Sequence, residues 1–174
     1  MNSGRKFKNK VVFWNLQTSC VVSSQEVEHY RTKNKLKLPK HIIRFDSTHE
    51  FKVYLELCRM YGSNRVLRQH EVKIAPPSLC YPNGKTWRCD FAINGFEETD
   101  YYEYLVEAKG LFMPEYGYIL SMLETHCPFA FYRLRTVFVD EIPIKKRIVQ
   151  SLMKSEVRGN LITFKKLQKL NELP

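Results

Sequence analysis

The chain contains 174 residues, of which 44% are hydrophobic and 26% are charged, and its formal net charge is +10. This length suits one domain with appended arms, and no apolar run approaches the roughly 20 residues that span a bilayer. The five cysteines form no Cys-x-x-Cys pair, which argues against a disulfide framework and against a structural zinc site. The N-terminus lacks the apolar core of a signal peptide, so we expect a cytoplasmic protein without a membrane segment.

The first 44 residues are predicted to form a basic N-terminal extension. The apolar run Val11 to Trp14 predicts a short strand or a docking segment. The polar, basic run Arg31 to Lys40 predicts a loop or an extended arm. Such an arm could lie along DNA, or it could be a solvated linker. Its candidate DNA contacts are Lys33, Lys35 and Lys37.

A helix is predicted from about residue 47 to Gly62. Ser47 and Glu50 have the Ser-x-x-Glu spacing of a capping box, and apolar residues then recur at helical spacing. Gly62 predicts the C-terminal end of the helix. Glu50 has two interpretations. It closes the capping box, or it is a metal ligand in the first turn of a helix beside a sheet.

Three strands are predicted next, and the last two form a hairpin. Val66 to Ile74 predicts the first strand, and Pro76-Pro77 and Asn83-Gly84 bracket the loop after it. Cys89 to Ile93 and Tyr102 to Ala108 are rich in aromatic and branched residues and predict an antiparallel pair.

The remaining residues predict a helix, a strand and a basic C-terminal extension. Pro114 begins the helix, and Phe129 to Val139 predicts a strand with Arg133 and Arg135 on one face as candidate phosphate contacts. Pro143 opens a basic helical stretch, and residues 161–164 predict a final strand. Three further candidate DNA contacts lie in the basic stretch: Lys145, Lys146 and Arg147. The predicted class is α/β or α+β, with a mixed central sheet flanked by helices.

Chemically distinctive residues gather in the predicted hairpin. A hairpin centred between Glu98 and Thr99 places Asp90 opposite Glu107, within about 5.5 Å at Cβ. Alternation places Glu107 and Lys109 on one face. Two acids this close repel each other unless a cation lies between them or one holds a proton. With the lysine, they could bind a divalent cation and direct a water at a phosphodiester, although a solvated hairpin edge with one Glu–Lys pair would look similar.

The charge distribution favours the first interpretation. Residues 1–44 hold ten Lys and Arg against two acids, and residues 145–174 hold eight against two. Residues 45–144 hold ten against fourteen. A phosphate-backbone partner needs basic surface, whereas a metal-dependent phosphodiesterase needs a small acidic centre. We therefore expect a core at 45–140 between basic extensions at 1–44 and 141–174.

The order of Glu50 on a helix, Asp90 on a strand and Glu107-Ala108-Lys109 on the next resembles the PD-(D/E)xK nuclease superfamily. Similar members include phage Holliday-junction resolvases, transposase-associated endonuclease subunits and homing or head-completion nucleases. The resemblance covers residues 45–139. Cys89 stands where the family often has proline, and the gap of 17 positions between Asp90 and Glu107 is longer than usual.

The resemblance implies a restriction-endonuclease-like core that binds Mg²⁺, with Mn²⁺ as a substitute. The implied metal ligands are Asp90, Glu107, the carbonyl of Ala108 and Glu50. Lys109 would orient or help deprotonate the attacking water or stabilise the phosphate, and Gln69 would position water or simply face solvent. Four more acids are alternative ligands: Glu97, Glu98, Asp100 and Glu103.

The function that follows is a metal-dependent DNA endonuclease acting in recombination, transposition, intron homing or phage DNA processing. The alternative is a non-catalytic nucleic-acid-binding protein that keeps the nuclease fold, although such a scaffold has no need of all three residues Asp90, Glu107 and Lys109. A basic RNA-binding domain would explain the charge but not the acidic hairpin. A homodimer is expected by analogy with nucleases of this size.

Overall fold

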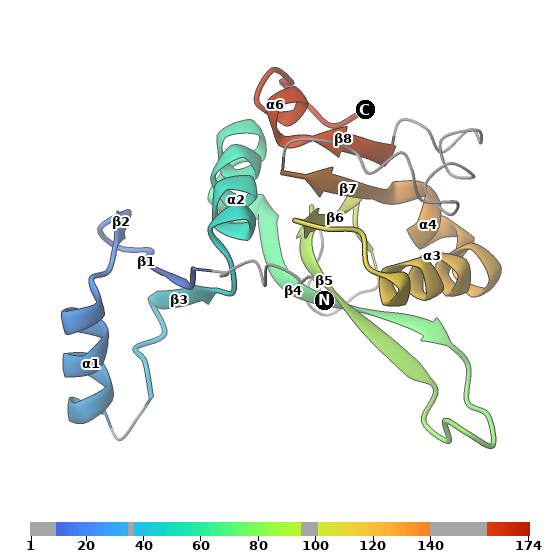
Figure 1. Ribbon diagram of the computed structural model, residues 1–174, viewed down its shortest axis with the longest axis horizontal. Helices are drawn as coiled ribbons and strands as arrows, with labels where there is room; N and C mark the ends of the chain where they lie inside the picture. The colour runs from blue at the N-terminus through green and yellow to red at the C-terminus, as the bar shows by residue number, and fades with distance from the viewer. Residues whose placement is uncertain (1–9, 35–36, 95–100, 140–159) are drawn as a thin grey trace, which may run out of the picture. The chain divides into compact units, whose positions relative to one another are not determined.

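The computed structural model describes residues 10–34, 37–94, 101–139 and 160–174 (Figure 1). The chain divides into two compact units, Met1–Lys52 and Val53–Pro174. The boundary falls inside helix α2 (Thr48–Tyr61), so the helix begins in the first unit and ends in the second. No helix among the described residues is long and apolar enough to cross a membrane.

The first unit contains a small antiparallel sheet. Strand β1 (Val12–Asn15) pairs with β2 (Cys20–Val21) on one side and with β3 (Ile42–Phe45) on the other. The short strand expected near Val11 to Trp14 is therefore confirmed. Rings of Trp14 and Phe45 contact Phe51 at the start of α2, with centroids 5.1 and 5.2 Å away.

Helix α1 (Ser24–Lys33) corrects one expectation from the sequence. The run from Arg31 was expected to be a loop or an arm, but its first three residues are the last residues of this helix. Ser23 and Glu26 form a capping box: the Glu26 N–H donates to Ser23 Oγ at 3.2 Å, and the Ser23 N–H donates to Glu26 Oε2 at 2.9 Å. These bonds satisfy backbone donors that would otherwise lack a partner at the helix start.

The second unit is built on a five-stranded mixed sheet. Its strands lie in the order β4 (Val66–Ala75), β5 (Lys85–Ile93), β6 (Tyr104–Lys109), β7 (Leu134–Phe138) and β8 (Leu161–Thr163). The first two pairs in this order are antiparallel, and the last two are parallel. The mixed sheet expected from the sequence is confirmed, as is the final strand, although Phe164 already begins helix α6 (Phe164–Leu167).

Helices cover both faces of this sheet. The connection from β6 to β7 contains α3 (Pro114–His126) and α4 (Pro128–Arg133), whose buried residues share one apolar cluster with Leu105 and Ala92. A short 3-10 helix, η1 (Ser63–Arg65), leads from α2 into β4. The ring of Tyr54 in α2 stacks on Phe91 with centroids 6.1 Å apart. Because Phe91 precedes Ala92, it points to the opposite face, so α2 lies against that face.

The strand predicted from Phe129 to Val139 is wrong in its first half. Residues 128–133 form α4, and only β7 is extended. Pro128 occupies the first turn of α4, where its fixed φ suits a helix and its missing N–H costs nothing. Arg133 therefore ends a helix while Arg135 lies within a strand, and the two do not share a strand face.

Candidate active site

Asp90 and Glu107 lie side by side on neighbouring strands. The β5–β6 ladder pairs Ile93 with Tyr104 and Phe91 with Val106, and the same register continued by one residue places Asp90 opposite Glu107. This is the register that the sequence predicted. The side chain of Glu107 is almost completely buried, with 4% of its surface exposed.

The two carboxylates take the place of the backbone ladder at this point. The Asp90 N–H donates to Glu107 Oε2 at 3.1 Å, and the Ala108 N–H donates to Asp90 Oδ2 at 2.9 Å. Each carboxylate is therefore held by a main-chain N–H of the opposite strand. Such charge-assisted hydrogen bonds hold both side chains in defined positions.

Side-chain alternation shifts in β4 at the level of this pair. In β4, Leu67, Val72 and Ile74 all pack in the cluster beneath α3 and α4. Regular alternation would send Leu67 to the opposite face from the other two, because it lies an odd number of positions away. Gln69 lies between them and has φ of 56°, a left-handed conformation within a strand. The alternation therefore shifts at or near Gln69.

Side-chain alternation in strand β5 shifts at the same level. Trp87 and Cys89 pack in the cluster beneath α3 and α4, and so does Ala92, three residues beyond Cys89. The β4–β5 pairing keeps one register on both sides of the shift, which places Gln69 opposite Asp90. Gln69, Asp90 and Glu107 thus form a row across three neighbouring strands. The shift in side-chain alternation occurs in the first two of these strands, β4 and β5.

Lys109 completes the group. Its ammonium pairs with Glu107 Oε1 and lies 4.7 Å from the centroid of the Tyr116 ring. Its side chain is 26% exposed, so the ammonium remains within reach of solvent and of a ligand. The sequence predicted that Glu107 and Lys109 would share a face, and their contact is consistent with that placement.

The electrostatic effect of the two acids extends to buried neighbours. Burial raises the pKa of the Cys89 thiol well above its usual value, and the charges of Glu107 and Asp90 raise it further. Burial likewise raises the pKa of the Tyr116 phenol, with Glu107 the next contributor. Both groups therefore stay neutral and add no charge of their own to the site.

This donor set fits a hard divalent cation. Among the described residues, no group of three or more His, Cys, Asp or Glu side chains is arranged to hold a metal. Mg²⁺, however, is usually bound by one or two carboxylates and completes its shell with waters and substrate phosphates. Asp90, Glu107 and the adjacent Ala108 carbonyl offer oxygen only, which suits Mg²⁺ or Mn²⁺.

Glu50 has a clear local role in the first unit. The Glu50 N–H donates to Ser47 Oγ at 3.0 Å, and Glu50 Oε2 accepts from the Asp46 N–H at 2.9 Å. These bonds cap α2 nearly as the sequence predicted, except that the carboxylate reaches Asp46 instead of Ser47. The role of Glu50 as a metal ligand stays a prediction.

Arg135 is not the exposed phosphate contact that the sequence suggested. It is 8% exposed, and its guanidinium donates to the carbonyl oxygens of Tyr132 at 2.9 Å, Leu134 at 3.2 Å and Pro174 at 2.5 Å. The bond to Pro174 ties β7 to the last described residues, and burial leaves Arg135 unsuited to contact DNA. The half-buried Arg133 lies over the ring of Phe129, 3.7 Å from its centroid.

Two of the other candidate DNA contacts lie among the described residues. Lys33 and Lys37 are exposed in the first unit. The remaining four lie outside the described residues: Lys35, Lys145, Lys146 and Arg147. Of the alternative acidic ligands, Glu103 instead accepts a hydrogen bond from Asn94 and lies 3.9 Å from Arg65. Glu97, Glu98 and Asp100 are outside the described residues.

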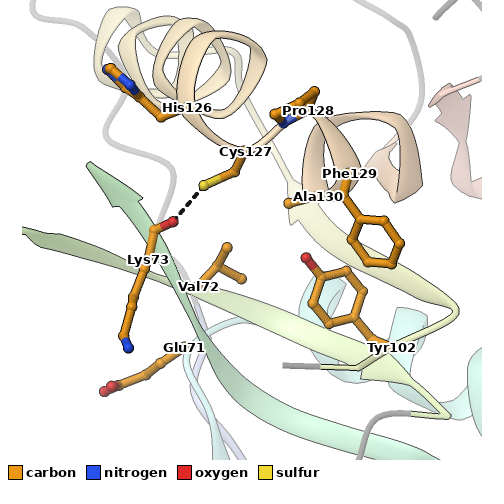
Figure 2. A pocket seen from close by; sticks show the side chains of 9 residues that line it. All are labelled: Glu71, Val72, Lys73, Tyr102, His126, Cys127, Pro128, Phe129 and Ala130. Carbon is orange, nitrogen blue, oxygen red and sulfur yellow. Dashed lines mark hydrogen bonds between the residues drawn. The ribbon is translucent and has the colours of Figure 1, made fainter. Parts of the chain in front are cut away.

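A pocket of about 370 Å³ lies elsewhere in the second unit, between β4 and the junction of α3 and α4. Figure 2 shows the Cys127 thiol donating to the carbonyl oxygen of Lys73, at 2.7 Å, while Tyr102 and Phe129 face each other across its other end. None of Asp90, Glu107 and Lys109 lines it. We therefore do not assign the chemistry to this pocket.

The sequence did not single out Tyr116 or Thr136, which both adjoin the site. The Tyr116 hydroxyl and Thr136 Oγ1 are 2.6 Å apart, and Thr136 is the register partner of Glu107 on β7. Only the parallel pairing of β6 with β7 brings Thr136 to the acids, and no local motif marks that pairing.

Comparison with known protein families, with characterised proteins and with solved structures finds no match.

Proposed function

We propose that this chain is a metal-dependent DNA endonuclease that hydrolyses phosphodiester bonds. The observation that carries the proposal is the pair of carboxylates, Asp90 and Glu107, fixed side by side with the ammonium of Lys109 against one of them. A purely structural Glu–Lys pair does not need a second, adjacent acid whose charge adds to the cost of burial.

The proposed metal ligands are Asp90, Glu107 and the main-chain carbonyl of Ala108. A divalent cation bound there would supply positive charge for the phosphate and lower the pKa of a bound water. The N–H groups of Asp90 and Ala108 hold the two carboxylates. Each carboxylate oxygen carries about two lone pairs, so an oxygen that accepts one hydrogen bond can still bind a cation.

Lys109 and Gln69 are assigned to the reacting groups. The partly exposed ammonium of Lys109 can stabilise charge that develops on the phosphate oxygens or orient the attacking water. Gln69 lies opposite Asp90 and has an amide that both donates and accepts, so we assign it to positioning water.

DNA is the proposed substrate because the chain combines a net charge of +10 with an acidic centre. The order of α2, β4, β5 and β6 and the positions of Asp90, Glu107 and Lys109 also support a restriction-endonuclease-like core of the PD-(D/E)xK type. A homodimer stays a prediction from analogy.

The test is cleavage of supercoiled plasmid, linear duplex and four-way-junction DNA with Mg²⁺, with Mn²⁺ and with EDTA. Asp90→Asn and Glu107→Gln keep an oxygen that accepts the observed N–H bonds but remove the charge, and we expect both to abolish cleavage. Lys109→Met should lower turnover by about 10²–10³ with little change in DNA affinity.

Matched controls are Glu71→Gln and Lys73→Met, which change the same charges at exposed positions of β4. Both should cleave as the wild type does. Cleavage in EDTA, or by Asp90→Asn, would refute the proposed chemistry. DNA binding by the wild type without cleavage under any of these conditions would favour the non-catalytic scaffold.

A further inference from the structure

Tyr116 is buried beside the proposed catalytic lysine. It lies in the first turn of α3 and is 2% exposed. Its ring packs edge-on against Phe112, with centroids 5.7 Å apart, and its hydroxyl is 2.6 Å from Thr136 Oγ1. Since Thr136 is itself 1% exposed and belongs to β7, the ring is anchored to the sheet at its hydroxyl end.

The face of this ring contacts the Lys109 ammonium, which lies 4.7 Å from the centroid. A cation at this distance is attracted by the negative face of the ring. Lys109 thus has two partners of different kinds, the Glu107 carboxylate and a neutral ring. A lysine side chain is flexible, and one ion pair at its end leaves several rotamers open.

We propose that Tyr116 is a positioning residue, whose ring holds the Lys109 ammonium beside Glu107. The inference rests on the proposed function, in which Glu107 also binds a metal. Any positive group that binds the Glu107 carboxylate weakens the electrostatic attraction between Glu107 and Lys109. The attraction between Lys109 and the ring does not depend on that carboxylate. The ring therefore keeps the ammonium near the reacting phosphate when Glu107 is engaged elsewhere.

The contact itself can be tested without catalysis. An aromatic ring shifts the NMR signals of protons above its face upfield, so the Lys109 Hε signals of the wild-type chain should be displaced upfield. Tyr116→Phe keeps the ring and should retain the displacement, whereas Tyr116→Leu should remove it. Wild-type Lys109 signals at ordinary positions would overturn the proposal, whatever the chain does to DNA.

Cleavage kinetics test the positioning role. Tyr116→Leu should lower kcat by roughly 3- to 30-fold, the factor expected for one partly desolvated cation–ring contact, with KM changed less than about twofold. Tyr116→Phe loses the bond to Thr136 and some stability, yet it should keep most of kcat. The control Tyr118→Leu, at a position of the same helix that is 71% exposed, should behave as the wild type does.

Fluorinated phenylalanines at position 116 provide a test if Tyr116→Leu fails to fold. Each added fluorine weakens the negative face of the ring at nearly constant shape, so kcat should fall stepwise along the series. A flat series, or Tyr116→Leu at wild-type kcat, would overturn the positioning role. If the wild type cleaves no DNA, the proposed function fails, and the NMR displacement still decides whether Tyr116 holds Lys109.

Discussion

At the scale of single residues, the backbone at Gln69 departs from regular strand geometry. Gln69 adopts φ of 56° within β4, which costs a non-glycine residue about 1–2 kcal/mol. Residues held in such conformations concentrate at functional sites. The strain at Gln69 coincides with the shift in side-chain alternation beside Asp90 and Glu107.

We expect Gln69→Val to lower the free energy of unfolding by about 1–2 kcal/mol beyond the effect of removing the amide, because a branched side chain tolerates positive φ poorly. Gln69→Gly should cost less, since glycine adopts this conformation freely. Urea unfolding measures both. The control Glu71→Val, two residues along the same strand, should be nearly neutral, and equal losses at the two positions would argue against strain at Gln69.

Part of the candidate site could be predicted from the sequence. Asp90, Glu107 and Lys109 follow from a period of two and a hairpin centre, which are local properties. The left-handed backbone conformation at Gln69 and the ring of Tyr116 could not be anticipated. Both depend on pairing and packing between segments distant in the chain, and no glycine or turn motif marks Gln69.

At the scale of elements, α2 begins at a capped end. Ser47 and Glu50 both satisfy backbone N–H groups there. Ser47→Ala should therefore lower the free energy of unfolding by about 1 kcal/mol, as loss of a helix cap does.

Glu50→Gln separates the two roles of Glu50, because glutamine still offers an oxygen to the Asp46 N–H. We expect stability to change by less than about 0.5 kcal/mol, because the capping bond is kept. A fall in metal-dependent cleavage would support the ligand role that the family resemblance implies. Thermal unfolding and plasmid nicking on the same samples measure both quantities. Unchanged cleavage would confine Glu50 to capping.

The elements also show where local patterns fail. The run from Phe129 to Val139 is aromatic and branched enough to predict a strand throughout, yet its first residues form α4. Pro128 was the local signal for a helix start, and Ala130 and Phe131 fill the core from that helix. For α1, the Ser23-x-x-Glu26 capping box was the signal, beside a basic run whose polarity suggested a loop.

At the scale of the whole molecule, the sheet could be predicted from the sequence but the division into units could not. The mixed sheet could be anticipated because several short strands alternate with helices. The division into units inside α2 could not, since no change in composition marks Lys52 and Val53.

Charge is divided unevenly along the chain. Net charges of +8 in residues 1–44 and +6 in residues 145–174 contrast with −4 between them.

Replacing Lys33, Lys35 and Lys37 by Ala should weaken binding to unrelated DNA sequences. For duplex DNA, removing one lysine that neutralises a phosphate should flatten the plot of log affinity against log salt by about 0.9. Fluorescence anisotropy across a salt series measures this slope. The charge-matched comparison is a variant with three exposed lysines of the other unit replaced by Ala: Lys165, Lys166 and Lys169. An unchanged slope in the first variant would make residues 31–40 a solvated linker.

Isothermal titration with Mn²⁺ tests most directly whether Asp90 and Glu107 hold a divalent cation. Wild type and Glu71→Gln should each show one site that Asp90→Asn loses, because that variant keeps its bond to the Ala108 N–H but not its charge. Mn²⁺ binding to Asp90→Asn with the wild-type affinity and stoichiometry would show that the cation does not depend on Asp90.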